Sequence, residues 1–401
     1  MHQVRTIAPD ITYLGVSDRR IALFENAFPV PRGVSYNSYL VADDDKTVLL
    51  DTVDKSVGER FFENLAFALQ GRALDYVIVS HMEPDHCATL EELVLRYPAV
   101  RLLCSQKAAQ MLGQFFSDAV SSRATVVREG ETLKTGRHEF AFYMAPMVHW
   151  PEVMMTFDRA DGTLYSADAF GSFGAINGNL FADEVNFERD WLDDARRYYT
   201  NIVGKYGAPV QTALKKALTL DIRRICPLHG LIWRENIGWY VEKYQRWSTY
   251  EPEDKAVVIF YASVYGHTEC AADTLAAALA DRGVKNIHLY DVSVTHPSYL
   301  VAEAFRAQCL VFAATTYNAG IFCNMETLIA DLKAHNIQNR KLCFIENGSW
   351  APSSGKLMRE TLCALPNMQP LCDTLTIRSA LKECQLPCLD ALADAIVCSL
   401  A

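Results

Sequence analysis

The 401-residue sequence contains twelve cysteines but no CxxC pair. The closest two, Cys384 and Cys388, are four positions apart, and the others are scattered along the chain. This pattern argues against a disulfide framework and against a rubredoxin-type iron site. It favours reduced thiols and therefore a cytoplasmic location.

Several other common features are also missing. Lys and Arg number 38 against 48 Asp and Glu, and the net charge of -10 includes no basic block, which argues against nucleic-acid binding. No apolar run is long enough to span a bilayer, and the N-terminal stretch MHQVRTIAPD lacks the pattern of a secretory signal, so we expect no membrane association. There is no internal repeat and no low-complexity tract.

What is present is enough apolar sequence for two domains. Half of the residues are hydrophobic, and 401 residues exceed what one core usually serves. The polar, proline-containing stretch STYEPEDK at 248–255 breaks the periodicity and is predicted to be a linker. We therefore predict domains at 1–250 and 255–401.

The two parts differ in pattern. The first mixes hairpin-like pairs, such as SYNSYLVADDDKTVLLDT, with helical patterns at about 56–71, 87–97, 187–203 and 234–246. The second alternates five short apolar runs with helical segments at 268–282, 298–307, 324–335, 354–364 and 388–399. Strict βα alternation with apolar strands predicts a doubly wound parallel sheet of the flavodoxin-like type, an α/β fold.

A dense group of ligand-type side chains follows the apolar run DYVIV at 75–79. The segment SHMEPDHCAT contains His81, Glu83, Asp85 and His86 in the pattern HxExDH. Alternate residues of an extended segment project to one side, so we expect the first three to converge, with His86 joining from the next helix. Four ionisable groups at the end of a buried strand need charge compensation, which a metal would supply.

Three later segments have the same form, an apolar run that ends on a ligand-type residue. They are YMAPMVHWPE with His149, TLYSADAFGS with Asp168, and RRICPLHG with His229. Any one of these histidines alone is more simply explained as a hydrogen-bonded or surface residue. The shared order and context of all seven residues favour a metal site.

Other residues with possible ligand atoms have no such context. Cys87 is predicted to be a small apolar residue at the start of a helix. Five further histidines lie outside such contexts and are assigned no role, and they are His2, His138, His288, His296 and His335.

The order of the seven residues resembles the metallo-β-lactamase fold, an αββα sandwich whose two-metal site uses HxHxDH followed by His, Asp and His. Glu83 stands here at the second histidine of that motif. A carboxylate in place of an imidazole shifts the preference from zinc toward a harder, redox-active metal such as iron. Asp168 is the natural bridge, since one carboxylate can bind two metals.

A second site is predicted in the flavodoxin-like part. In AVVIFYASVYGHTECAADTL, a hydroxyl-rich loop joins a strand to a helix and can bind a phosphate at the helix N-terminus. It is neither Walker A nor GxGxxG, and alone it could be an ordinary βα turn. Two further loops, ATTYNAGIF and ENGSWAPSSGK, follow the third and fourth strands of this part, and together the three loops resemble the FMN site of flavodoxins.

We expect the FMN contacts to come from all three loops, with Tyr317 and Trp350 able to pack against a flat ring. The predicted contacts are Ser263, Val264, Tyr265, Gly266, His267, Thr268, Thr315, Thr316, Tyr317, Asn318, Ala319, Gly320, Asn347, Gly348, Ser349, Trp350 and Ala351.

The combination of both parts resembles the flavodiiron proteins over nearly the whole chain. The resemblance implies one iron on His81, Glu83 and His149, and a second on Asp85, His86 and His229, with Asp168 bridging. It also implies reduction of O2 to water or of NO to N2O in detoxification. A chain that ends at 401 resembles the two-domain class, which implies a separate electron donor such as rubredoxin. It also implies a head-to-tail homodimer or a dimer of such dimers.

Two alternatives remain at this stage. One is a dizinc hydrolase of the lactamase superfamily with a flavodoxin-like binding module, against which Glu83 argues. The other is a flavodoxin-like electron carrier whose lactamase-like part has lost its metals, which would require missing ligands. Tyr36, Tyr39 and Trp150 are possible neighbours of the metal site, although aromatic residues in strands are usually core.

Overall fold

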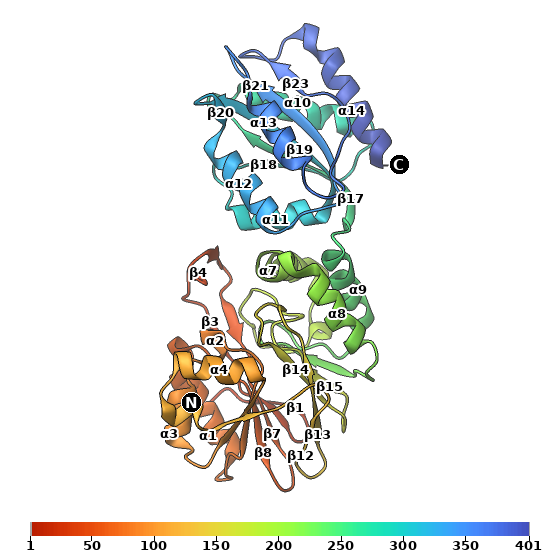
Figure 1. The fold of residues 1–401 in the computed structure, drawn as a ribbon. Coiled ribbons are helices and arrows are strands. Elements are labelled where there is room, and N and C mark those ends of the chain that lie inside the picture. The colour runs from red at the N-terminus through yellow and green to blue at the C-terminus, as the bar shows by residue number, and fades with distance from the viewer. Residues whose placement is uncertain (1, 401) are drawn as a thin grey trace. The chain divides into compact units, whose positions relative to one another are not determined.

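The computed structural model describes residues 2–400, which form two compact units (Figure 1). The first contains the chain up to Tyr199 together with Ala208–Gln245, and the second contains Thr200–Gly207 and the chain from Arg246 onward. The predicted linker lies where α9 (Ile237–Ser248) ends and β17 (Asp254–Ala262) begins. Its Tyr250 is buried in the core of the second unit, so this stretch is not a free chain.

Two sheets make up the centre of the first unit. The larger has the order β1 (Arg5–Ala8), β2 (Ile11–Tyr13), β7 (Tyr39–Ala42), β8 (Thr47–Leu50), β9 (Tyr76–Val79), β10 (Arg101–Cys104) and β11 (Ala124–Val126). The smaller has the order β12 (Thr132–Lys134), β13 (Glu139–Met144), β14 (Met154–Asp158), β15 (Thr163–Tyr165) and β16 (Arg224–Cys226). The antiparallel pair β7–β8 confirms the predicted hairpin around the acidic turn.

Helices lie between and after these strands, as expected for an αββα sandwich. The predicted helices near 56–71 and 87–97 are α1 (Gly58–Leu69) and α3 (Leu90–Arg96). Three helices were not predicted. They are α4 (Gln106–Phe115), which Ser105 caps by accepting from Ala108 N, α5 (Asp118–Ser121) and α8 (Gly207–Ala217).

The predicted helix at 187–203 is divided. It consists of α6 (Phe187–Asp190), α7 (Leu192–Tyr198) and a wider helical turn at Tyr199–Val203. Trp191 separates the first two because its φ of -131° is not helical.

The second unit has a parallel sheet in the order β18 (Ile287–Asp291), β17, β19 (Ala307–Tyr317), β21 (Lys341–Asn347) and a last position shared by β22 (Gln369–Pro370) and β23 (Leu375–Ile377). One face is covered by α11 (Pro297–Arg306), α12 (Cys323–Ala334) and α13 (Ser354–Leu362). The other is covered by α10 (His267–Asp281) and α14 (Leu386–Leu400). This is the 2-1-3-4-5 order of flavodoxin-like sheets and confirms the predicted fold.

Among residues 2–400, no helix combines the length and the apolar character needed to cross a membrane.

The buried His138 links segments of the first unit through contacts with two carboxylates. His138 Nδ1 bonds the Asp158 carboxylate, and its Nε2 lies 2.9 Å from Asp10 Oδ2, which Arg137 also contacts. Asp43 completes the group, but its two oxygens already accept from Thr135 Oγ1 and from backbone N–H groups. Because the acceptor sites of Asp43 are filled, we interpret this group as a structural ion pair and not as a metal site.

The charge state of His138 should make stability depend on pH. Burial opposes its charged form, but Asp158 and Asp10 outweigh that effect and raise its pKa from the ordinary 6.5 to about 9. The resulting stabilisation is complete below about pH 6.5 and is lost as the pH rises through about 9. We predict that the urea midpoint of the parent falls across this range relative to His138→Gln. A constant difference between the two proteins would contradict the assignment.

Candidate metal centre and cofactor pocket

All seven predicted ligands lie in the first unit on segments that follow strands. His81, Glu83, Asp85 and His86 follow β9, His149 follows β13, Asp168 follows β15 and His229 follows β16. Their exposed fractions are at most 8%. The structure therefore brings together side chains that are far apart in sequence, the most distant being His81 and His229, which are 148 positions apart.

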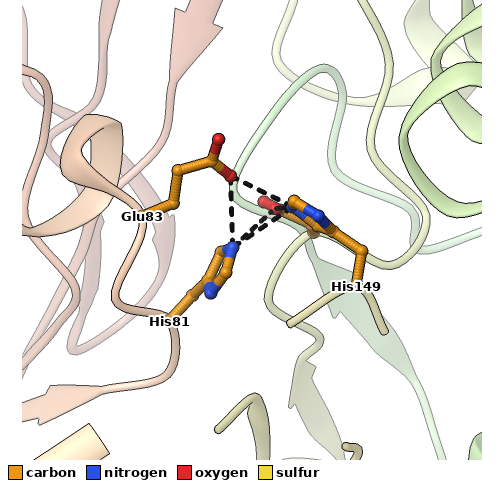
Figure 2. A group of neighbouring side chains, drawn as sticks. His81, Glu83 and His149 are labelled. Atoms are coloured by element: carbon orange, nitrogen blue, oxygen red, sulfur yellow. Dashed lines mark hydrogen bonds and ion pairs between the residues drawn. The ribbon is translucent and has the colours of Figure 1, made fainter. Parts of the chain in front are cut away.

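The first group is formed by His81, Glu83, His149 and Asp168. His81 Nε2 lies 3.2 Å from Glu83 Oε2 and 3.2 Å from His149 Nε2, and His149 Nε2 lies 3.0 Å from the same Glu83 oxygen. Figure 2 shows the two ring nitrogens and this carboxylate oxygen converging on one point. Two imidazoles and a carboxylate in this arrangement suit a transition metal.

The second group is formed by Asp85, His86 and His229. His86 Nε2 lies 3.1 Å from His229 Nε2. Asp85 Oδ1 lies 3.4 Å from His86 Nε2, and Asp85 Oδ2 lies 3.3 Å from His229 Nε2. Asp85 does not lie beside His81 and Glu83, because the short helix α2 (Pro84–Cys87) begins directly after Glu83. Pro84 at the first helical position turns the chain there.

Asp168 joins the two groups. Its Oδ2 lies 3.0 Å from His149 Nε2 and 3.4 Å from His81 Nε2. Its Oδ1 lies 3.1 Å from His86 Nε2 and 3.6 Å from His229 Nε2. One oxygen thus faces each group, which is the arrangement that a bridging carboxylate requires.

The electrostatics of the seven residues fit two cations. Asp168 Oδ1 and both Asp85 oxygens are buried, and no hydrogen-bond donor among the described residues satisfies them. Burial disfavours charged histidine, yet Asp168 and Glu83 raise the pKa of His149 to about 9, and Asp85 and Asp168 do the same for His86. Three buried carboxylates therefore favour positive charge at this position, which two metal ions would supply.

Unusual backbone conformations hold the ligands in place. Ala167 and Phe170, on either side of Asp168, have φ values of 52° and 67°. Gly230, directly after His229, has φ 74°, and a Cβ there would lie 3.0 Å from the Ser172 side chain. Such conformations are costly and are concentrated at functional sites.

Several residues around the ligands were not predicted. His81 Nδ1 lies 2.7 Å from Glu152 Oε1, and His229 Nδ1 lies 2.7 Å from Ser35 O. Glu25, in the hairpin of β4 (Leu23–Phe24) and β5 (Phe28–Pro29), has a pKa raised to about 8 by loss of solvation of its carboxyl and by Glu83. Only Glu152 left a signal in the sequence, as the acid three positions after His149.

Aromatic rings enclose the centre. Trp150 lies 5.2 Å from the ring of His81, and Tyr36 lies 5.9 Å from the ring of His229. Phe24, from the β4–β5 hairpin, also meets His229 edge-on at 5.4 Å. The contact of Tyr39 with the centre is indirect. Its hydroxyl donates to Pro227 O at 2.7 Å, in the segment just before His229.

The second unit contains a cavity of about 530 Å³ at the carboxyl ends of its strands. Of the predicted FMN contacts, all except Gly266 and Gly320 line it. Gly266 is instead the N-cap residue directly before α10. Its φ is 88°, and its N–H donates to Ser263 Oγ at 3.0 Å. No side chain caps the first turn of α10, which leaves its N–H groups available to a phosphate.

Polar contacts fix the three loops relative to one another. Thr268 Oγ1 and Thr315 Oγ1 are 3.0 Å apart, and Asn347 Nδ2 donates to Thr268 Oγ1 and to Ser379 O. Ser379 was not predicted, although it directly follows the fifth strand in TLTIRS. Tyr265 and Trp350 are 90% and 82% exposed, so a planar ligand could cover both aromatic rings.

Comparisons with known proteins find similarity along nearly the whole chain. Residues 34–230 match the model of the ODP family beta lactamase. The nitric oxide reductase of Moorella thermoacetica is 30% identical over 367 residues, covering 91% of this chain and 90% of that protein. The chain belongs to the flavodiiron protein family.

Solved structures of flavodiiron proteins extend the likeness to the whole fold. The rubredoxin oxygen:oxidoreductase of Desulfovibrio gigas matches with a TM-score of 0.92 and 27% identity, covering 99% of this chain and 98% of that one. A flavo di-iron protein variant from Thermotoga maritima matches with a TM-score of 0.89 and 25% identity, covering 100% and 98%.

The bridging position of Asp168 predicts how metal binding depends on it. We expect anaerobic titration with Co2+ to saturate at two ions per chain of this flavodiiron protein. Asp168→Ala should weaken both ions together, because each group loses one oxygen. Asp85→Ala, which changes only the second group, is the matched control and should weaken one ion more than the other. Loss of a single ion in Asp168→Ala would contradict the bridge.

Proposed function

We propose that this flavodiiron protein reduces O2 to water or NO to N2O and serves in detoxification of these gases in the cytoplasm. The observation that carries the proposal is the carboxylate of Asp168 between two histidine–carboxylate groups, with Glu83 in the first of them. Glu83 occupies the position at which dizinc members of the lactamase superfamily have histidine, and it favours iron over zinc.

The proposed ligand assignment follows the two groups. His81, Glu83 and His149 hold one iron, Asp85, His86 and His229 hold the other, and Asp168 bridges them. The irons and the reduced flavin together supply the electrons that reduction of a diatomic gas needs. The chain itself excludes bulk water from the ligands, which are nearly fully buried, and encloses them with Phe24, Tyr36 and Trp150.

FMN is proposed to bind in the cavity of the second unit. Its phosphate lies at the first turn of α10, where Ser263 and Thr268 offer hydroxyls. The loops that carry Tyr317 and Trp350 border the flavin ring. Electrons come from a separate carrier, and the Desulfovibrio gigas protein, named as a rubredoxin oxygen:oxidoreductase, makes rubredoxin a suitable first donor to test.

The proposal predicts two irons and one FMN per chain and gas consumption that requires both. The double variant Ser263→Ala/Thr268→Ala should lose FMN, since each hydrogen bond to a charged phosphate is worth roughly 1.5–3 kcal/mol. Iron content should stay at the parent level, while O2 and NO consumption with a reduced donor falls with the flavin. Iron and flavin are measured on anaerobically purified protein.

The control for this experiment is Thr274→Ala. Thr274 is also on α10, but it is only half-buried and its hydroxyl donates to Cys270 O at 2.7 Å, outside the cavity. It should retain FMN and activity. Stoichiometric zinc without iron or flavin in the parent would contradict the reductase and favour a dizinc hydrolase.

The working unit is proposed to be a head-to-tail homodimer in which the flavin of one chain serves the irons of the other. Support comes from the short stretch between α9 and β17, residues 249–253, which is anchored by Tyr250 in the core of the second unit. It also comes from the exposed Tyr265 and Trp350 beside the cavity, which an interface would cover. Twofold symmetry is the commonest state of soluble oligomers.

Complementation tests this arrangement. His149→Ala removes an iron ligand, and the Ser263→Ala/Thr268→Ala variant lacks firmly bound flavin, so each homodimer should be nearly inactive. A mixed dimer should regain about one working flavin–iron pair if electrons cross the interface. Activity of the mixture no higher than that of the two separate variants would rule out transfer between chains.

A further inference from the structure

A second carboxylate lies directly behind one metal ligand. Glu152 Oε1 lies 2.7 Å from His81 Nδ1, the ring nitrogen that faces away from the other ligands. The same oxygen accepts from Met82 N at 2.9 Å, and Glu152 O accepts from Ser105 Oγ at 2.8 Å. The side chains of His81 and Glu152 both have no exposed surface. Glu152 is therefore held rigidly against His81 from its own loop between β13 and β14.

The second ligand group has no equivalent carboxylate. His229 Nδ1 faces the neutral backbone carbonyl of Ser35 at 2.7 Å. His86 Nδ1 is buried and has no hydrogen-bond partner among residues 2–400. The two ligand groups thus present the same kinds of side chain to a metal, but they differ in the hydrogen-bond partner of the outer ring nitrogen, Nδ1, of their histidines.

This difference has a chemical consequence. A carboxylate on the outer nitrogen of a metal-binding imidazole fixes its tautomer and orientation and makes the inner nitrogen more basic. Glu152 Oε2 is buried without a partner among the described residues, so the charge of this carboxylate is not neutralised elsewhere and acts on His81.

We propose that Glu152 is a positioning residue that makes the metal held by His81, Glu83 and His149 the more tightly bound of the two. The inference rests on the ligand assignment under Proposed function. It predicts that a chelator removes iron in two stages, with the metal of Asp85, His86 and His229 leaving first. Removing the Glu152 carboxylate should weaken only the iron beside His81.

Each half can be measured alone in a variant that lacks a ligand of the other half. His229→Ala leaves the group around His81, and His149→Ala leaves the group around His86. Fe2+ affinity is determined anaerobically by competition with a chromogenic ferrous chelator, which reports binding and not turnover. In the His229→Ala background, Glu152→Ala should lower the affinity about 10–100-fold. In the His149→Ala background, the same change should alter it by less than about twofold.

Glu152→Gln separates positioning from general structure. The amide oxygen can accept the same two hydrogen bonds from His81 and Met82, but it carries no charge. Its loss of affinity should be about tenfold smaller than that of Glu152→Ala, and the FMN content should equal that of the parent. If Glu152→Ala does not fold, Glu152→Gln alone decides: it must weaken iron in the His229→Ala background and not in the other.

Asp158 offers a matched control. It is a buried carboxylate of the same unit that bonds Nδ1 of a buried histidine, His138, outside the metal centre. Asp158→Asn should lower the stability of the protein but leave both iron affinities unchanged. If Asp158→Asn weakens iron as much as Glu152→Gln does, the effect of Glu152 is general destabilisation and the inference is overturned.

The remaining outcomes are also decisive. Equal weakening in both backgrounds, or none in either, would overturn the role of Glu152 while the parent still binds two irons. A parent protein that binds no iron would instead contradict the proposed function. The two failures are therefore distinguishable.

Discussion

The structure of the first unit depends on the burial of three carboxylates within a few ångströms of one another. Glu83, Asp85 and Asp168 repel one another, and without cations only the surrounding histidines offset their charge. Asp168 is at the centre of this problem, since its two oxygens face different groups. Two divalent metals would neutralise the three carboxylates. No further positively charged side chain would then have to be buried beside them. The strained turns at Ala167 and Phe170 are retained because they aim Asp168 at both groups.

The second unit meets a different constraint, which is to hold a phosphate and a planar ring without charged side chains. None of the residues that line its cavity is Lys or Arg. In the proposed FMN site, backbone N–H groups, the dipole of α10 and the hydroxyls of Ser263 and Thr268 would replace them. The loops are held together by the contact of Thr268 with Thr315 and by the contacts of Asn347 with Thr268 and Ser379.

Much of the fold and of the site could be predicted because the signals are local. Each proposed metal ligand lies on the segment that follows an apolar strand, and the flavodoxin-like sheet follows from regular βα alternation. What was missed depends on contacts between distant segments. The pairing of Glu152 with His81 spans 71 positions, and although Glu152 stands three positions after His149, nothing in the sequence pairs it with His81. The start of α2 at Pro84 separates Asp85 from Glu83, which simple strand alternation does not foresee.

From membership of the flavodiiron family and from the geometry of Asp168, we infer that this carboxylate bridges two irons within a single chain. Mössbauer spectroscopy of the air-oxidised, 57Fe-loaded protein tests this claim most directly. We expect a spin-coupled ferric pair, seen as a diamagnetic quadrupole doublet that contains nearly all of the iron. A spectrum of two independent paramagnetic ferric sites would contradict it.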